Sequence, residues 1–287
     1  MKIRVISSVV ALILLAAIMF LGREAIGIAV FILAAIGIHE FYGAMEKGGY
    51  KPVRIIGYLS CLALLYLTFR DRISLGGFTF HFIPFKGLAF LIFLMLLAVF
   101  CVMVFQHGKY TIPDMAVTML GVFYVVFLFS FIILVRNMGD RGDLYIWLVF
   151  AGAWATDTAA YLTGVSIGRT KILPEVSPKK SLEGSIGGVV GCVAVMTALG
   201  IYLNTLGIYY QNGVSGIPVY HYIILGILCG CISQVGDWAA SAIKRYTGIK
   251  DYGRLMPGHG GVLDRFDSIL LTAPVVYFYL SLFLSMS

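Results

Sequence analysis

The chain consists mainly of long apolar runs separated by short polar segments. The runs lack the strict alternation of a transmembrane β-barrel, and most approach the roughly 20 apolar residues that a helix needs to cross a bilayer. The pattern therefore predicts an all-α, polytopic integral membrane protein with about nine transmembrane helices. The predicted spans are residues 5–22, 26–45, 54–69, 84–105, 113–135, 143–164, 186–206, 218–245 and 264–285.

The composition agrees with this pattern. Hydrophobic residues make up 60% of the chain and charged residues only 12%, whereas a soluble domain carries about a quarter charged residues. The class of soluble globular proteins is therefore excluded. We attribute the formal charge of +7 to cations in cytoplasmic loops, and we expect no nucleic-acid partner because no such binding motif is present. The five cysteines all lie in apolar runs, and we interpret them as small core residues.

The distribution of lysine and arginine predicts the orientation in the membrane. If the N-terminus lies inside, fifteen of the 21 Lys and Arg residues fall on the cytoplasmic side and six fall outside. Cytoplasmic loops carry the excess of positive charge in membrane proteins. We therefore expect a multi-pass protein of the inner (cytoplasmic) cell membrane, with a cytoplasmic N-terminus and a C-terminus outside.

Four acidic residues fall toward the cytoplasmic ends of three predicted helices: Asp157, Asp237, Asp264 and Asp267. An ionised Asp near mid-membrane costs about 2.5–3.5 kcal/mol, so chance explains four such acids at one membrane face poorly. Carboxylate oxygens suit Mg²⁺, which takes one or two carboxylates together with waters and substrate phosphates. We predict a metal site formed by Asp237, Asp264 and Asp267. For Asp237 alone, a structural pair with a neighbouring cation is the alternative.

Cations and hydroxyls accompany these acids. Ser241, Lys244 and Arg245 follow Asp237 at spacings of four, seven and eight residues, which places them on one helix face. Lysine binds phosphate as a point charge. The pattern therefore predicts a site for phosphate-bearing substrates, in which Lys244 and Arg245 are catalytic and Ser241 binds substrate. The loop residues Ser177, Lys179 and Lys180 are predicted to bind substrate too, although the two lysines have the alternative role of topology signals.

The segment from Lys244 to Asp267 is the richest in cations, Asp and Gly. We predict catalytic roles for His259 and Arg265, and substrate-binding roles for Lys250, Gly260 and Gly261. A cap on the following helix is the alternative for His259. On the sixth predicted span, Asp157 and Tyr161 lie four residues apart on one face and are predicted to bind the nucleotide or a second cation. His39 and Glu40 are interpreted as support for the site or as helix-packing residues.

The motif from Ser241 to Asp267, S-A-I-K-R…K-D-Y-G…P-G-H-G-G-V-L-D-R-F-D, resembles the signature of the phosphatidate cytidylyltransferase family, bacterial type. Trp154–Gly164 and Val176–Gly184 are similar to accompanying motifs of that family. Met256, Val176 and Ser181 are conservative departures. The resemblance implies that CTP and phosphatidate react to CDP-diacylglycerol and pyrophosphate in phospholipid biosynthesis. It also implies that Mg²⁺ is required and is held by Asp237 and Asp264, with K⁺ as a candidate second cation.

These predictions define one membrane domain over residues 1–287. Within it, residues 1–140 form a hydrophobic helical N-terminal part and residues 143–287 a catalytic C-terminal part. Two other functions stay open, a carrier for an anionic solute and a CTP-dependent polyprenol or lipid kinase. The absence of an internal repeat argues mildly against the carrier. The oligomeric state, a homodimer included, is open as well.

Overall fold

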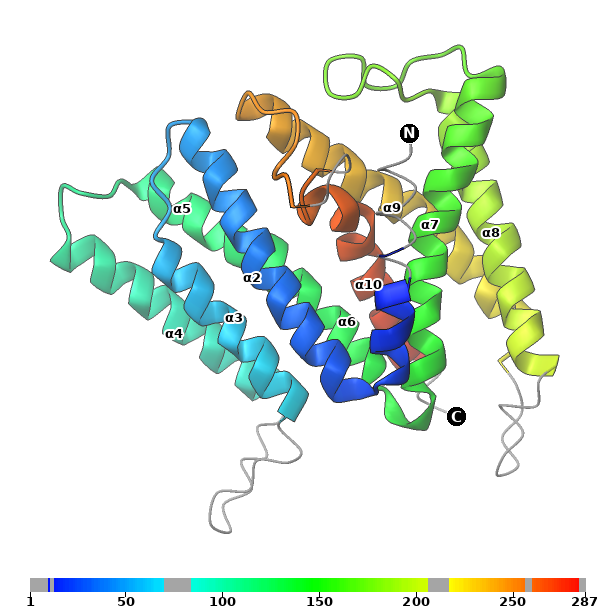
Figure 1. Cartoon of the computed structure of the whole chain (residues 1–287), viewed down its shortest axis with the longest axis horizontal. Helices are drawn as coiled ribbons and strands as arrows, with labels where there is room; N and C mark the ends of the chain where they lie inside the picture. Colours follow the sequence, from blue (N-terminus) through cyan, green and yellow to red (C-terminus); the bar gives the residue numbers. More distant parts are fainter. Residues whose placement is uncertain (1–9, 11–12, 70–83, 206–216, 256–259, 284–287) are drawn as a thin grey trace, which may run out of the picture. The chain divides into compact units, whose positions relative to one another are not determined.

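The computed structural model describes residues 10, 13–69, 84–205, 217–255 and 260–283, and all regular elements within these ranges are helices (Figure 1). This confirms the all-α prediction. The chain divides into two compact units. Unit 1 comprises Met1–Ile133 and Tyr246–Leu263, and unit 2 comprises Leu134–Arg245 and Asp264–Ser287. Whether one membrane domain includes both units stays a prediction.

The helices of unit 1 come first along the chain, and those of unit 2 follow. Unit 1 contains α2 (Arg23–Lys47), α3 (Arg54–Phe69), α4 (Pro84–Phe105), α5 (Ile112–Gly121), the π-helix η1 (Val122–Phe127) and most of α6 (Leu128–Arg136). Unit 2 contains the 3₁₀ turn η2 (Gly139–Arg141), α7 (Gly142–Ile167), α8 (Leu182–Thr205), α9 (Val219–Tyr246, up to Arg245) and α10 (Leu263–Phe283, from Asp264).

Several of these helices are long and apolar enough to cross a membrane. In the described part of the chain they are α2, the continuous stretch Ile112–Arg136, α8, α9 and α10. The chain is therefore a multi-pass membrane protein. The total of nine spans and the orientation stay predictions, since α3 and Ile92–Phe105 of α4 are shorter apolar helices and α7 is not among the helices long and apolar enough to cross a membrane. In the first predicted span, residues 5–9, 11 and 12 lie outside the described residues.

In unit 1, the turn between α2 and α3 is fixed by side chains of α5. Gly49 adopts a φ of 90°, a conformation that glycine reaches without a steric penalty. The Lys51 backbone N–H donates to Asp114 Oδ1 at 2.6 Å, and the Val53 backbone N–H donates to Thr118 Oγ1 at 2.8 Å. These two backbone N–H groups lie between helices, and they find their hydrogen-bond acceptors on side chains within the same unit.

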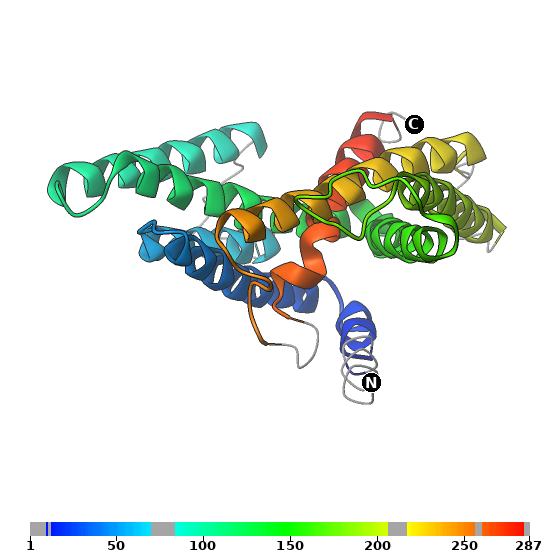
Figure 2. The ribbon, with the colours of Figure 1, turned by 90° about the horizontal axis from the view of Figure 1, so that it is seen from above.

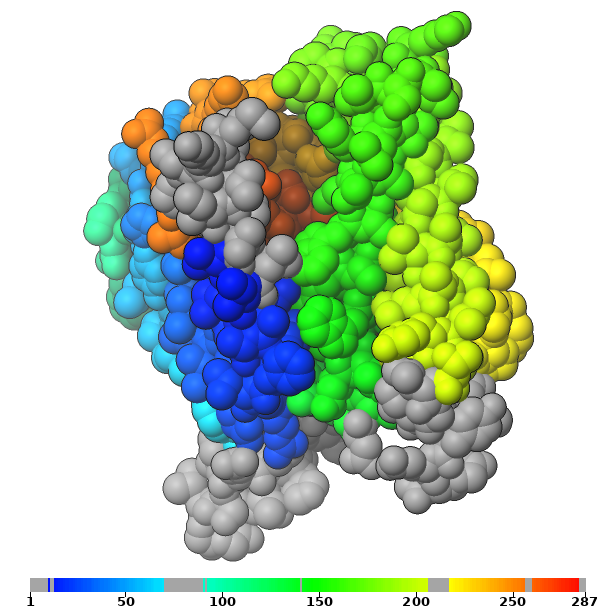
Figure 3. Space-filling view, turned by 45° about the vertical axis from the view of Figure 1, so that its right-hand side comes forward, coloured from blue at the N-terminus to red at the C-terminus, as the bar shows by residue number. Residues whose placement is uncertain are grey.

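In unit 2, α7 and α8 run side by side, as Figures 1 and 2 show. Small residues allow the close approach. A Cβ added to Gly187 would lie 2.2 Å from the Thr163 hydroxyl, and one added to Gly191 would lie 2.2 Å from the Ala159 Cβ. Helices that associate in membranes commonly approach through such small residues. The space-filling view shows α7 and α8 as one packed surface (Figure 3).

The contact between α8 and α9 is equally tight. Gly226 and Gly230 lie four residues apart on α9, and both face backbone atoms of α8. A Cβ on Gly226 would lie 2.7 Å from the Cα of Val193, and one on Gly230 would lie 2.9 Å from the Cα of Val189. Because backbone cannot rotate away as a side chain can, the two helices have no room for any larger residue at these positions.

We predict that Gly226→Ala destabilises the protein by forcing α8 and α9 apart. Overpacking of a tight contact costs about 1–3 kcal/mol, so the thermal unfolding midpoint in detergent should fall by several degrees. Ile227→Ala is the control, because the neighbouring Ile227 side chain is 44% exposed. An unchanged midpoint for Gly226→Ala would show that the helices adjust without cost.

Candidate active site

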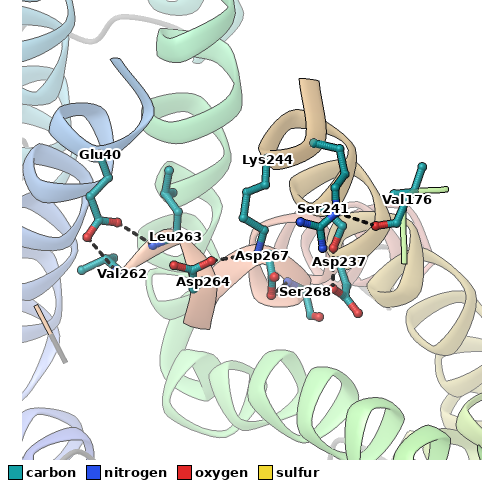
Figure 4. A network of polar contacts seen from close by, with 11 residues as sticks. Glu40, Val176, Asp237, Ser241, Lys244, Val262, Leu263, Asp264, Asp267 and Ser268 are labelled. Atoms are coloured by element: carbon teal, nitrogen blue, oxygen red, sulfur yellow. Dashed lines mark hydrogen bonds and ion pairs between the residues drawn. The ribbon is translucent and has the colours of Figure 1, made fainter. Parts of the chain in front are cut away.

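Predicted site residues from three helices and one loop lie close together within unit 2. The helices are α7, α9 and α10, and the loop is residues 168–181 between α7 and α8. Figure 4 shows the part of this group that α9 and α10 contribute. Close packing brings the two helices together here, since a Cβ on Gly236 would lie 2.4 Å from the Asp267 carbonyl oxygen. Parts of α9 and α10 are visible beside α7 in Figure 3.

A lysine on α9 and an aspartate on α10 form the first ion pair of the site. Lys244 Nζ donates to Asp264 Oδ1 at 2.8 Å (Figure 4). The two side chains are 13% and 5% exposed, so water screens the pair poorly. Removing one partner of such a pair leaves an uncompensated buried charge, which is strongly destabilising.

The second ion pair joins the loop to α9. Lys180 Nζ contacts Asp237 Oδ2, and Asp237 Oδ1 accepts a weak hydrogen bond of 3.5 Å from Ser241 Oγ. Burial by itself lowers the pKa of Lys180, but the Asp237 carboxylate outweighs this effect, and the pKa of Lys180 lies above its ordinary value. The lysine therefore stays charged at physiological pH. Lys180 also interacts electrostatically with Asp157 and Asp267.

The remaining two acids complete the group. Ser268 Oγ of α10 donates to Asp157 Oδ1 of α7 at 3.3 Å. Asp267, which is 9% exposed, accepts from the Ser268 backbone N–H at 2.8 Å. Asp157 interacts electrostatically with Asp237 and with the exposed Arg265. Unit 2 thus brings the four acids of three helices near one another, and their roles in a site stay a prediction.

The loop that carries Lys180 is fixed at its base by α8. Glu183, in the first turn of α8, accepts from the Arg169 backbone N–H at 3.0 Å and from the Thr170 hydroxyl at 3.0 Å. The Leu182 backbone N–H donates to the Thr170 carbonyl oxygen at 2.8 Å. The two ends of the loop are therefore held together, which restricts where Lys180 can lie.

Arg245 fixes the same loop nearer its middle. Its Nε donates to the Val176 carbonyl oxygen at 3.2 Å. The sequence analysis assigned Arg245 to catalysis as a phosphate-binding cation. In the structure its guanidinium contacts loop backbone, so it also positions the segment that precedes Lys180.

The remaining predicted residues are two exposed residues, a loop serine and a segment that belongs to unit 1. Lys179 and Tyr161 are exposed, and Ser177 accepts from the Lys180 backbone N–H at 3.1 Å within the loop. Three predicted substrate-binding residues belong to the segment that packs with unit 1: Lys250, Gly260 and Gly261. His259 lies outside the described residues.

Two residues of the site were not identified from sequence. Ser268 binds Asp157 from the second turn of α10, where a serine carries no distinctive signal. Glu183 holds the loop from the first turn of α8, where glutamate is common for local reasons. The only sequence signal for these two residues is their position: Ser268 follows Asp267, and Glu183 lies shortly after the paired lysines.

The residues of the site fit a magnesium ion chemically. They offer carboxylate and hydroxyl oxygens, the donors that Mg²⁺ prefers, and Mg²⁺ needs only one or two protein carboxylates. Lysine ammonium groups form ion pairs with Asp237 and Asp264, which indicates that both carboxylates attract cations. Within the described ranges no three His, Cys, Asp or Glu side chains form a ready cage for a metal, so substrate phosphates and water would have to supply further ligands.

Comparison with known proteins agrees with the sequence motifs. Residues 2–283 match the sequence model of the Cytidylyltransferase family. The chain is 30% identical over 283 residues to the phosphatidate cytidylyltransferase of Bacillus subtilis, covering 99% of this chain and 98% of that protein. It is 32% identical over 311 residues to the phosphatidate cytidylyltransferase of Synechocystis, covering 98% and 97%. With a match over nearly its whole length, the chain belongs to the cytidylyltransferase family of enzymes.

Proposed function

We propose that this protein is a phosphatidate cytidylyltransferase, which converts CTP and phosphatidate to CDP-diacylglycerol and pyrophosphate. Membership of the family and the names of the relatives support the reaction. The assignment of the site rests on two lysine–carboxylate contacts within unit 2. Lys180–Asp237 joins the loop to α9, and Lys244–Asp264 joins α9 to α10. This arrangement offers both charges that two phosphate-bearing substrates and a metal ion require.

The proposed reaction needs no strong general base. A phosphate oxygen of phosphatidate, already anionic, attacks the α-phosphorus of CTP, and the bond from this phosphorus to the oxygen bridging to the β-phosphate breaks. Pyrophosphate leaves with the electron pair of that bond. Because two polyanions must meet, catalysis consists mainly of alignment and of positive charge placed where negative charge develops.

The residues of unit 2 divide this work. Asp237 and Asp264 would hold Mg²⁺, which neutralises charge on the CTP phosphates when bound. Lys180, Lys244 and Arg265 supply further positive charge for the phosphates. Ser241 and Asp267 orient the carboxylates, Asp157 binds the nucleotide or a second cation such as K⁺, and Lys179 and Arg245 add positive charge at the edge of the site. His259, which lies outside unit 2 and outside the described residues, would add to this charge.

We further propose that the protein lies in the inner cell membrane with nine spans, a cytoplasmic N-terminus and an external C-terminus. The excess of Lys and Arg in segments assigned to the inside supports this orientation. The site then faces the cytoplasm, where CTP is available, and the inner leaflet, where phosphatidate is available. A homodimer is compatible with this arrangement.

The reaction can be tested with two forms of labelled CTP. Purified protein in detergent micelles with phosphatidate and Mg²⁺ should transfer label from α-³²P-CTP into the lipid phase and none from γ-³²P-CTP. Transfer of the γ label would indicate a kinase instead. Uptake of CTP into vesicles without any labelled lipid would indicate a carrier.

We predict that Asp264→Asn and Asp237→Asn each lower kcat/KM for CTP by about a hundredfold or more, because each removes a carboxylate that would hold the Mg²⁺ ion that stabilises the transition state. Synthesis of CDP-diacylglycerol across a Mg²⁺ series provides the measurement. Asp143→Asn is the matched control, since Asp143 lies at the other end of α7 and its side chain is 65% exposed. Turnover and Mg²⁺ dependence near wild type in a folded Asp264→Asn protein would exclude the metal-binding role.

The two adjacent lysines of the loop should differ in effect. Lys180 contacts Asp237, whereas Lys179 is exposed. We expect Lys180→Ala to lower kcat/KM by about tenfold to a hundredfold and Lys179→Ala to change it by less than about threefold, within the range of an exposed charge. Steady-state kinetics with each substrate varied provides the comparison. Equal losses in both variants would contradict the arrangement of the loop.

A further inference from the structure

Glu40 is a buried acid of α2 that the proposed mechanism does not use. Its side chain is 6% exposed, although it is ionisable and lies in one of the apolar helices able to cross a membrane. A carboxylate in such a place is costly unless hydrogen bonds compensate for its lost hydration. The sequence analysis interpreted Glu40 as support for the site or, more often in such a position, as a helix-packing residue.

The structure supplies the partners from more than 200 residues further along the chain. Glu40 Oε1 accepts from the Val262 backbone N–H at 3.0 Å, and Glu40 Oε2 accepts from the Leu263 backbone N–H at 3.0 Å (Figure 4). All three residues belong to unit 1. Leu263 is the first residue of α10, and the first N–H groups of a helix have no acceptor within it. Glu40 therefore caps α10 from another helix.

The glycines of the preceding segment make room for this carboxylate. A Cβ on Gly253 would lie 2.2 Å from Glu40 Oε1, and one on Gly261 would lie 2.3 Å from the same atom. Neither glycine has a positive φ, so lack of volume, and not backbone conformation, is what these positions require. Gly261 was predicted to bind substrate. In the structure, the Glu40 carboxylate occupies the space that a side chain at position 261 would need.

Gly253, Gly261, Val262 and Leu263 thus lie around one carboxylate, and this carboxylate fixes the first residue of α10. Asp264 follows Leu263 directly, and Arg265 and Asp267 lie in the same turn and the next. The direction in which Asp264 projects depends on the backbone that Glu40 holds. The full negative charge of Glu40 also complements the positive end of the helix dipole.

We propose that Glu40 is a positioning residue for the reaction, which sets the start of α10 so that Asp264 is correctly oriented. The inference rests on the proposed function for its kinetic consequence, but the cap itself can be observed independently. A misplacement of about 1 Å in a catalytic group can lower a rate by about a hundredfold. A cap that only adds stability would leave the rate of the folded enzyme unchanged.

The central variant is Glu40→Gln, which keeps the shape of the side chain but presents an NH₂ group to one of the two N–H donors. We expect backbone amide hydrogen exchange in the peptide containing Val262 and Leu263 to increase about tenfold, and kcat to fall about tenfold to a hundredfold. The KM for CTP should change by less than about threefold, because the cations that bind it remain. Glu40→Asp, which retains the charge, should recover part of kcat. Glu46→Gln is the control, since Glu46 is an exposed acid of the same helix that pairs with Arg54.

A double-mutant cycle separates the cap from general damage. Gly253→Ala should lower kcat in the wild type, because its Cβ displaces the Glu40 carboxylate, and should have a much smaller additional effect in Glu40→Ala, where the clash is gone. Faster exchange in Glu40→Gln with unchanged kcat would overturn the positioning role, and so would strictly additive effects in the cycle. Wild-type protein that forms no CDP-diacylglycerol would overturn the proposed function and the kinetic role with it, whereas the exchange data would still report whether the cap exists.

Discussion

The candidate site depends on the balance of negative charge among apolar helices. Ionised carboxylates in such surroundings are costly unless cations or hydrogen-bond donors lie against them. Lys244 neutralises Asp264 and Lys180 neutralises Asp237. These two contacts link α9 to α10 and α9 to the loop before α8. The chemistry and the packing of unit 2 are therefore not separable, since the same charges serve both.

Around this centre, three charged residues fix backbone segments. Glu183 holds the base of the loop, Arg245 holds its middle, and Glu40 holds the start of α10. Each of the three uses a charged side chain to bind backbone N–H or C=O groups, which gives stronger hydrogen bonds than neutral groups do. A reaction that relies on alignment more than on acid–base chemistry requires such rigid support.

Hydrophobic pattern alone predicted most of the fold. The spans expected at 54–69 and 84–105 agree with α3 and α4 to the residue, because long apolar runs end where Pro, Gly and charged residues begin. The association of the segment Tyr246–Leu263 with unit 1 was not predicted, because it depends on contacts between residues far apart in the chain. Local sequence carries no signal for such contacts.

The site, too, could be predicted only in part from local sequence. Residue type predicted a group of acids and lysines, but it could not distinguish Lys179 from Lys180, which are neighbours of identical chemistry. Their difference arises only from the path of the loop. Arg245 illustrates the converse, since its charge suggested a phosphate ligand, whereas the fold places a carbonyl oxygen against its guanidinium.

The fit between Glu40 and its two glycines also constrains how this sequence can change. A side chain at position 253 or 261 needs the volume that the carboxylate occupies, and a shorter residue at position 40 would leave both a void and unsatisfied backbone donors. The three positions are therefore coupled in evolution. A lineage that replaces the acid must at the same time find another acceptor for α10, and an alanine at either glycine becomes tolerable only after the acid has gone.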